Sequence, residues 1–216
     1  MDRKLDESEK GCIFADENEN DEMVNKVMGR IRLPMGYLAP VAWYKAVATA
    51  DEVVVEQKEH FVKQTWRNRC RIAMPDGPQD LVVPVVAAPN HTALCDIRIS
   101  DHGNWRHHHW SALRTAYGKS PFFEYYADDF APFYEKRYEF LADFTEGLRM
   151  VVSQLIDLET PVTLSEAYAP PIPFEELPVP TEPYYQVFRQ RLGFLPNLSI
   201  VDLLFNLGPE SLLYLK

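Results

Sequence analysis

The chain has 216 residues, of which 46% are hydrophobic and 25% are charged, and its formal net charge at pH 7 is −10. A chain of this length can bury a sizeable core, and its composition is that of a soluble globular protein. The acidic balance argues against nonspecific nucleic-acid binding, which needs a broad basic footprint. No apolar run is long enough to span a bilayer, and the N-terminus lacks the apolar core of a signal peptide, so we expect a cytoplasmic location.

The N-terminal region differs from the rest of the chain. Residues 16–22 are acidic and polar without apolar periodicity, so residues 1–28 are expected to form a disordered tail or a short capping helix. Residues 29–216 are expected to form a single domain. Cys12, Cys70 and Cys95 show no metal-ligand spacing and are interpreted as reduced thiols.

The domain is expected to begin with a strand at 31–33, a helix that starts at Pro40, and a second strand at 53–55. This order opens a parallel α/β unit, so the predicted fold class is α/β. We expect a parallel or mixed sheet flanked by helices, with a helical C-terminal part. Ligands usually bind at the carboxyl ends of parallel strands. This geometry would place residues 34–37 beside residues 56–60, next to the segment 63–71.

Turn residues, helical spacing and alternation predict the remaining elements in chain order. These are a hairpin of strands 69–74 and 81–86, a strand at 96–99, helices at 105–117, from Pro121 and at 138–156, and a strand at 161–165.

The C-terminal part follows a proline-dense segment, residues 169–183, which is expected to be an extended strap over the domain. Residues 197–206 predict a helix capped by Asn197 or Ser199. Asp202 and Asn206 lie one turn apart among leucines, so they need hydrogen-bond partners if they face inward. The arginines of the segment 63–71 are the hypothesised partners.

The segment 60–72 concentrates cationic and amide side chains in an acidic chain. Such groups hold planar or anionic ligands through several directed hydrogen bonds, although a solvated face with ordinary ion pairs is the alternative. The candidate ligand-binding side chains here are Gln64, Arg67, Asn68 and Arg69.

Candidate acid–base groups are also present. His60 and Lys63, with Glu56 upstream, could form an acid–base group, or could be ordinary solvated side chains. His109 faces inward on the predicted helix 105–117 and is either a site histidine or a satisfied core histidine. Consecutive residues 107–109 lack the i,i+3 or i,i+4 spacing of metal ligands, so no metal site is predicted.

Tyr126 lies on an aromatic helix face that could line a pocket or belong to the core. The sequence contains no Gly-x-Ser-x-Gly elbow, Walker loop or Gly-x-Gly-x-x-Gly motif, which excludes nucleotide binding through those known cradles. No cofactor is assigned.

Several of these stretches together resemble the WbqC-like protein family, from Arg30 to near the C-terminus. The matching segments are 37–44, 50–56, 63–72, 105–110, 117–126 and 193–208, and the Arg67-Asn68-Arg69 segment is the most specific. The family is typically bacterial and is associated with surface-polysaccharide and sugar-nucleotide gene clusters. Many members carry a Gln-Pro pair where this chain has Leu33-Pro34, so a binding role of that glutamine is not expected here.

Two hypotheses follow. The first is a cytoplasmic enzyme of that metabolism that transfers a group to a sugar and binds a small anionic ligand. Its proposed catalytic residues are His60, His109 and Lys63, and its proposed ligand-binding residues are Tyr37, Gln64, Arg67, Asn68, Arg69 and Tyr126.

The alternative is a noncatalytic binding or scaffold protein of the same pathway, in which the arginine segment stabilises the tail 184–216. Under either hypothesis the apolar tail is a candidate surface for self-association into a homo-oligomer.

Overall fold

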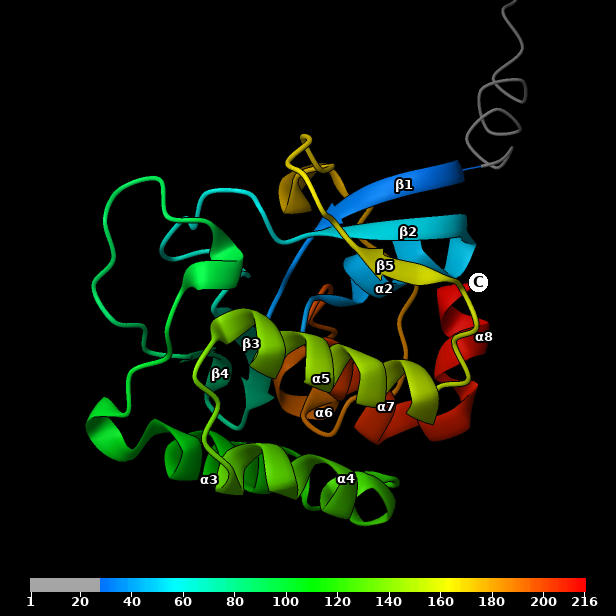
Figure 1. Ribbon diagram of the computed structural model, residues 1–216. Coiled ribbons are helices and arrows are strands. Elements are labelled where there is room, and N and C mark those ends of the chain that lie inside the picture. Colours follow the sequence, from blue (N-terminus) through cyan, green and yellow to red (C-terminus); the bar gives the residue numbers. More distant parts are fainter. Residues whose placement is uncertain (1–27) are drawn as a thin grey trace, which may run out of the picture.

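The structure is a computed structural model that describes residues 28–216. The tail predicted for residues 1–28 therefore lies outside the described residues, apart from Met28. A three-stranded sheet has the order β1 (Met28–Pro34), β2 (Ala50–Glu56) and β5 (Val162–Leu164), and all its neighbours are parallel (Figure 1). Parallel strands need a crossover, and α2 (Val41–Thr49) supplies it between β1 and β2. The predicted α/β class is confirmed.

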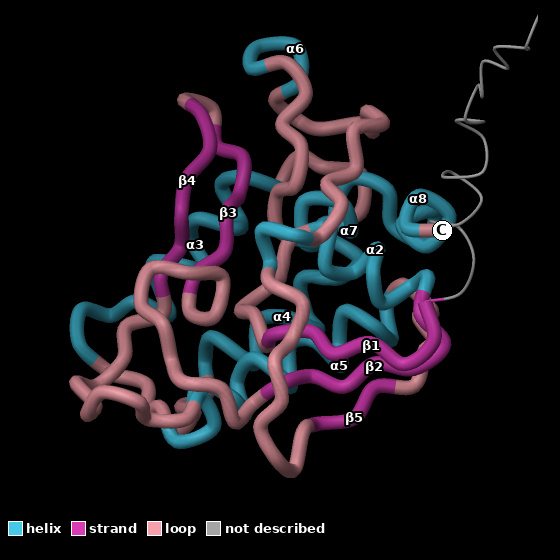
Figure 2. Tube along the Cα trace, turned by 90° about the horizontal axis from the view of Figure 1, so that it is seen from above, coloured by secondary structure: helices cyan, strands magenta, loops and turns pink. Residues whose placement is uncertain are grey.

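The predicted hairpin is present as β3 (Arg69–Met74) and β4 (Gly77–Val82), which pair antiparallel. Figure 2 shows this pair set apart from the three-stranded sheet. β4 begins at Gly77 rather than at residue 81. Gly77 has a φ of 131°, a conformation that residues with a Cβ rarely adopt, so strand pairing starts directly after the turn residues Pro75 and Asp76.

Helices fill the space on one side of the sheet, with α5 and α7 in the middle and α3 and α4 farthest from it (Figure 1). None of the helices in the described residues is long and apolar enough to cross a membrane. Their bounds are α3 (Trp105–Tyr117), α4 (Phe123–Glu135), α5 (Leu141–Leu155), α6 (Arg189–Leu192), α7 (Ile200–Leu207) and α8 (Ser211–Leu215).

The strand predicted at residues 96–99 is wrong. A short 3₁₀ helix, Leu94–Asp96, occupies its start, and Ile99 makes an isolated bridge with Val85. Arg98 bridges Phe140 instead, so neighbouring residues pair with different segments and no continuous ladder forms. The alternation of buried Ile97 and Ile99 around an exposed Arg98 is real, but it serves two separate contacts.

Helix α7 lies inside the core, and each of residues 200–206 is buried, including Asp202 and Asn206. The Oδ2 atom of Asp202 accepts hydrogen bonds from the Tyr184 hydroxyl (2.6 Å) and from the Gln186 amide (2.9 Å). The Asn206 amide donates to the Asp202 carbonyl (2.7 Å). The hypothesis that arginines of the segment 63–71 pair with these residues is wrong, because Tyr184 and Gln186, which directly follow the proline-rich strap, supply the partners.

The segment before α7 ties the C-terminal part to the first crossover. Asn197 does not cap α7: its Oδ1 accepts a hydrogen bond from the Ala42 amide (3.0 Å) in the first turn of α2. Ser199 is the residue that precedes α7, and its hydroxyl donates to the Leu38 carbonyl (2.7 Å). Asn197 has a φ of 54°, in the left-handed region that asparagine tolerates better than most residues.

Substitution of Asn197 separates its two roles. We expect Asn197→Ala to lower the free energy of unfolding by about 2 kcal/mol. It loses a hydrogen bond worth about 1 kcal/mol, and alanine tolerates the left-handed region less well than asparagine, which costs about 1 kcal/mol more. Asn197→Gly loses only the hydrogen bond, so its loss should be about half as large. Urea denaturation measures both. Equal losses would contradict the backbone contribution, and no loss in either variant would contradict the cap.

Asp202 predicts a specific pH dependence. Burial raises its pKa from the ordinary value to about 6, and the hydrogen bonds from Tyr184, Gln186 and Tyr117 only partly oppose this. The native state then holds a proton that the unfolded chain has already lost, so stability falls as pH rises from about 4 to 6, by roughly 3 kcal/mol.

Urea denaturation of wild type and Asp202→Asn between pH 4 and 7 checks this, because the asparagine variant lacks that contribution and the difference curve should fall with pH. Asp80→Asn is the control, since hydrogen bonds from Arg71 hold the pKa of Asp80 below its usual value. Its contribution to stability changes only below about pH 4, so its difference curve should be nearly flat in this range. A flat difference curve for Asp202→Asn would disprove the buried ionisation.

Candidate functional site

The carboxylate of Glu56, at the end of β2, joins four segments. It is buried and accepts hydrogen bonds from the Arg32 guanidinium (2.7 Å), the Lys58 amide (2.6 Å), the Ser165 hydroxyl (2.7 Å) and the Ala169 amide (3.1 Å). Desolvation alone would raise the pKa of Glu56, but the hydrogen bonds together outweigh it and the pKa is lowered. This carboxylate therefore fixes the loop that leaves β2 and the start of the strap.

The loop after β2 is closed by a second ion pair. Arg67 donates from Nε and Nη2 to the two oxygens of Glu59, at 2.9 and 2.6 Å, and from Nη1 to the Thr65 hydroxyl at 3.2 Å. The two charged side chains are only 15% and 8% exposed. Each terminal nitrogen of Arg67 thus has a partner within its own loop. This pairing favours a loop-closing role over the predicted ligand role, which stays a prediction.

The same loop and the hairpin enclose a hollow of about 160 Å³, here called the arginine hollow. The predicted site residues Gln64 and Arg69 both line it. Gln64 has a φ of 61°, an unusual backbone conformation for a residue with a side chain, and such strain clusters at ligand-binding loops. The full lining is Gln64, Thr65, Trp66, Arg69, Cys70, Arg71, Asp80 and Glu175.

Asp80 organises the charge of the arginine hollow. It accepts from Arg71 Nε at 2.7 Å and Nη2 at 3.3 Å, and from Arg69 Nη1 at 3.1 Å. Arg71 and Asp80 face each other across the hairpin. The Nε atom of Arg69 is buried and has no hydrogen-bond partner among residues 28–216. One donor of a residue that lines the hollow therefore has no partner within the described part of the chain.

The proline-rich strap forms part of the wall. Glu175 lines the arginine hollow, and the neighbouring Phe174 ring lies 6.5 Å from the ring of Trp66, centroid to centroid. Gly36 permits this approach, since a Cβ at that position would come within 2.9 Å of the Phe174 ring. The strap therefore has a structural part in the candidate site.

The structure brings Tyr37 and His109 together inside the core. The Tyr37 hydroxyl lies 2.9 Å from His109 Nδ1 and 2.9 Å from the Tyr134 hydroxyl. These contacts join Tyr134, Tyr37 and His109 in one buried polar chain. Desolvation lowers the pKa of His109 to about 4, so this ring is neutral and a weak base at neutral pH.

Cys70 lies where this buried network meets the arginine hollow. Its side chain is wholly buried, and it interacts with the Tyr37 hydroxyl. Burial raises the pKa of the Cys70 thiol well above its usual range, and a thiol in that state is a poor nucleophile. In this structure His109 is therefore a weak base and Cys70 a poor nucleophile, and the Tyr37 hydroxyl serves to connect them.

His60 and Lys63 lie elsewhere. His60 is exposed, and its Nδ1 lies 3.1 Å from Nδ1 of His91. Lys63 and His91 line a second hollow of about 110 Å³, here called the lysine hollow. Glu56 does not join them, because its oxygens are occupied by the four donors described above.

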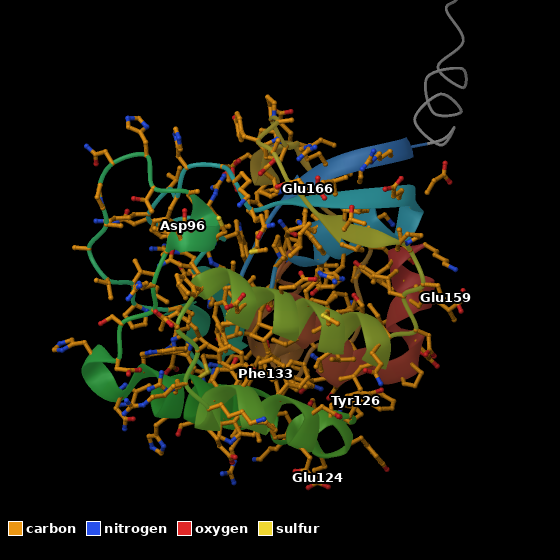
Figure 3. The ribbon with its side chains drawn as sticks, viewed as in Figure 1. Asp96, Glu124, Tyr126, Phe133, Glu159 and Glu166 are labelled. Atoms are coloured by element: carbon orange, nitrogen blue, oxygen red, sulfur yellow. The ribbon has the colours of Figure 1, made fainter. Side chains whose placement is uncertain are left out.

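The remaining predicted residues are separate again. The Asn68 amide donates to the Val83 carbonyl (2.9 Å) and is buried. Tyr126 lies on α4, on the side of the molecule away from the three-stranded sheet (Figure 3). Its ring stacks on Phe122, with centroids 6.4 Å apart. Their ligand-binding roles stay predictions.

The predicted residues therefore fall into separate places, and the arginine hollow includes residues that were not predicted. Asp80 was missed because the second hairpin strand was expected to begin one residue after it; the correct register would have placed it opposite Arg71. Glu175 and His91 carry no signal in the sequence that marks them as neighbours of the 60–72 segment.

Comparisons with known proteins agree with the resemblance. A Mycobacterium tuberculosis protein described as "Uncharacterized protein Rv1507c" is 26% identical, over 83% of this chain and 94% of its own length. No solved structure matches the chain significantly. The sequence model of the WbqC-like protein family matches residues 36–177, which include β2, the 60–72 segment, the hairpin and the first part of the strap. The chain belongs to the WbqC-like protein family.

Proposed function

We propose that this protein acts in the cytoplasm, in bacterial surface-polysaccharide or sugar-nucleotide metabolism, and binds a small anionic ligand in the arginine hollow. The observation that carries the proposal is the buried Nε of Arg69, which has no partner among residues 28–216 and lies in a residue that lines this hollow. A buried donor without a partner costs about 1–3 kcal/mol. A phosphate or carboxylate oxygen of a ligand would satisfy it after a shift of the Arg69 side chain that opens this atom to the hollow, because the atom is closed to solvent in this structure.

The lining also supports a ligand with polar groups besides its charge. Arg69 and Arg71 face Asp80 and Glu175, so formal charges in the hollow balance and net attraction is small. Recognition then depends on directed hydrogen bonds from the arginine side chains and the Gln64 amide, with the Trp66 ring as an apolar surface. This mixture suits a sugar that carries a phosphate or a carboxylate.

Group transfer to a sugar is the reaction proposed for this site. The candidate acid–base residues His60 and Lys63 lie outside the arginine hollow, and His109 is buried and neutral. The arginines are paired with Glu59 and Asp80. These observations favour a second candidate, in which the protein binds the same ligand without transforming it.

Arg69 provides the test. A thermal-shift screen of the full chain against sugar nucleotides, acyl-coenzyme A thioesters and amino acids should find a ligand that raises the melting temperature. Arg69→Lys keeps the charge but loses Nε and the planar fork, so binding should weaken by roughly tenfold, which corresponds to about 1.4 kcal/mol. Arg69→Ala should abolish the shift.

Arg137→Ala is the matched control, because Arg137 is 78% exposed and pairs with Asp101 at the surface; it should respond to the ligand as the wild type does. Equal ligand shifts in Arg69→Ala and wild type would exclude the arginine hollow. A ligand-free Arg69→Lys protein that fails to fold would make Arg69 structural. Incubation of the bound ligand with sugar acceptors, followed by mass spectrometry, separates transfer from binding alone.

A further inference from the structure

His60 and His91 form a pair that neither the fold nor the arginine hollow explains. Their segments run antiparallel, held by the hydrogen bond from the Phe61 amide to the Thr92 carbonyl (3.0 Å) and by a bridge between His60 and Ala93. The two rings lie 4.7 Å apart, centroid to centroid, with 67° between their planes, and both are exposed. The pair is therefore accessible and its backbone is fixed.

The contact between the rings constrains what lies between them. Their Nδ1 atoms are 3.1 Å apart. A neutral imidazole has a lone pair on one nitrogen and a proton on the other, so two Nδ1 lone pairs that face each other at this distance repel. The approach is stable when one Nδ1 carries a proton that the other accepts, or when both lone pairs bind one cation.

The geometry points to a metal site: we propose that His60 and His91 bind one divalent first-row transition-metal ion, such as Zn²⁺ or Ni²⁺, through their Nδ1 atoms. An ion at about 2.05 Å from both nitrogens would have an N–metal–N angle of about 98°, given their separation of 3.1 Å. This angle lies between the octahedral and tetrahedral values. Imidazole is a favoured ligand of these ions.

The backbone of His91 provides independent support. Its φ is 65°, in the left-handed region that is uncommon for residues other than glycine, asparagine and aspartate. This strained conformation belongs to the residue whose ring meets His60. Backbone strain at a side chain that meets a second potential ligand is a feature of binding sites.

The site is open. No group of three or more His, Cys, Asp or Glu side chains that could hold a metal is found in residues 28–216, so water or an outside ligand must complete the coordination. His91 also lines the lysine hollow with Lys63. The ion and the Lys63 ammonium together would attract an anion there. Since Lys63 also repels a cation, we expect weak, exchangeable metal binding.

Calorimetric titration of the full chain, without a polyhistidine tag, with ZnCl₂ and with NiCl₂ tests the site. The wild type should bind one ion at the pair. His60→Ala and His91→Asn should each weaken that binding by roughly tenfold or more. Asparagine is chosen at position 91 because it tolerates the positive φ. Circular dichroism of the metal-free variants should match the wild type, because both side chains are exposed.

The double variant His107→Ala/His108→Ala is the matched control, since these adjacent histidines are also exposed and their rings lie 6.2 Å apart. It should bind the ion as the wild type does. Absence of binding in the wild type, or undiminished binding in both pair variants, would overturn the site. Loss of binding only in the control would reassign the ion to α3. Histidine ¹⁵N spectra of the wild type add a readout without mutation: Zn²⁺ should shift two Nδ1 resonances, and unchanged spectra would also overturn the proposal.

Discussion

The buried carboxylate of Glu56 is the constraint on which the candidate site depends. A charge in the interior is tolerated only when its oxygens are fully hydrogen-bonded, and here a guanidinium, a hydroxyl and two amides meet that need. The donors come from β1, from the loop after β2 and from the segment between β5 and the strap. The hydrogen bonds that the Glu56 carboxylate needs therefore hold the loop and the strap in place relative to each other. Both of these segments line the arginine hollow.

The arginines that are concentrated after β2 form local ion pairs and do not make up a single cationic pocket. Arg67 closes its own loop with Glu59, and Arg71 pairs across the hairpin with Asp80. Ion pairs of this kind keep guanidinium groups in fixed orientations, which a ligand site needs, but they leave little net charge to attract a ligand. Arg69 differs from the other two because its pairing is incomplete. In the proposed site, selectivity would therefore come from directed hydrogen bonds rather than from net charge.

Local periodicity predicted much of the fold. The bounds of α3 and β3 match the expectation, because helical spacing and the adjacent turn are signals within a short window. The adjacency of residues 34–37, the end of β2 and the 63–71 segment also holds: Pro34 pairs with Glu56, and the Tyr37 amide donates to the Trp66 carbonyl (2.9 Å). A parallel pair of strands fixes that adjacency by topology alone.

Partner choice over long distances was not predictable. Asp202 takes its donors from Tyr184 and Gln186, just after the strap, and Asn197 caps a helix that lies 155 residues earlier in the chain. The sequence indicates that a buried polar side chain needs a hydrogen-bond partner, but it does not indicate which residue is that partner. The predicted site residues do not lie in one place for the same reason. Residues that are close in sequence are distributed between the two hollows and the interior.

The position of α7 has a consequence for the order in which the protein can fold. Residues 200–206 of this helix are buried, and the helices α2, α3, α4 and α5, which it contacts, precede it in sequence. These helices lack their central packing partner until α7 docks. Contacts between segments far apart in sequence form slowly, because the loop-closure entropy is lost before the contacts repay it, so intermediates without a docked α7 expose apolar surface.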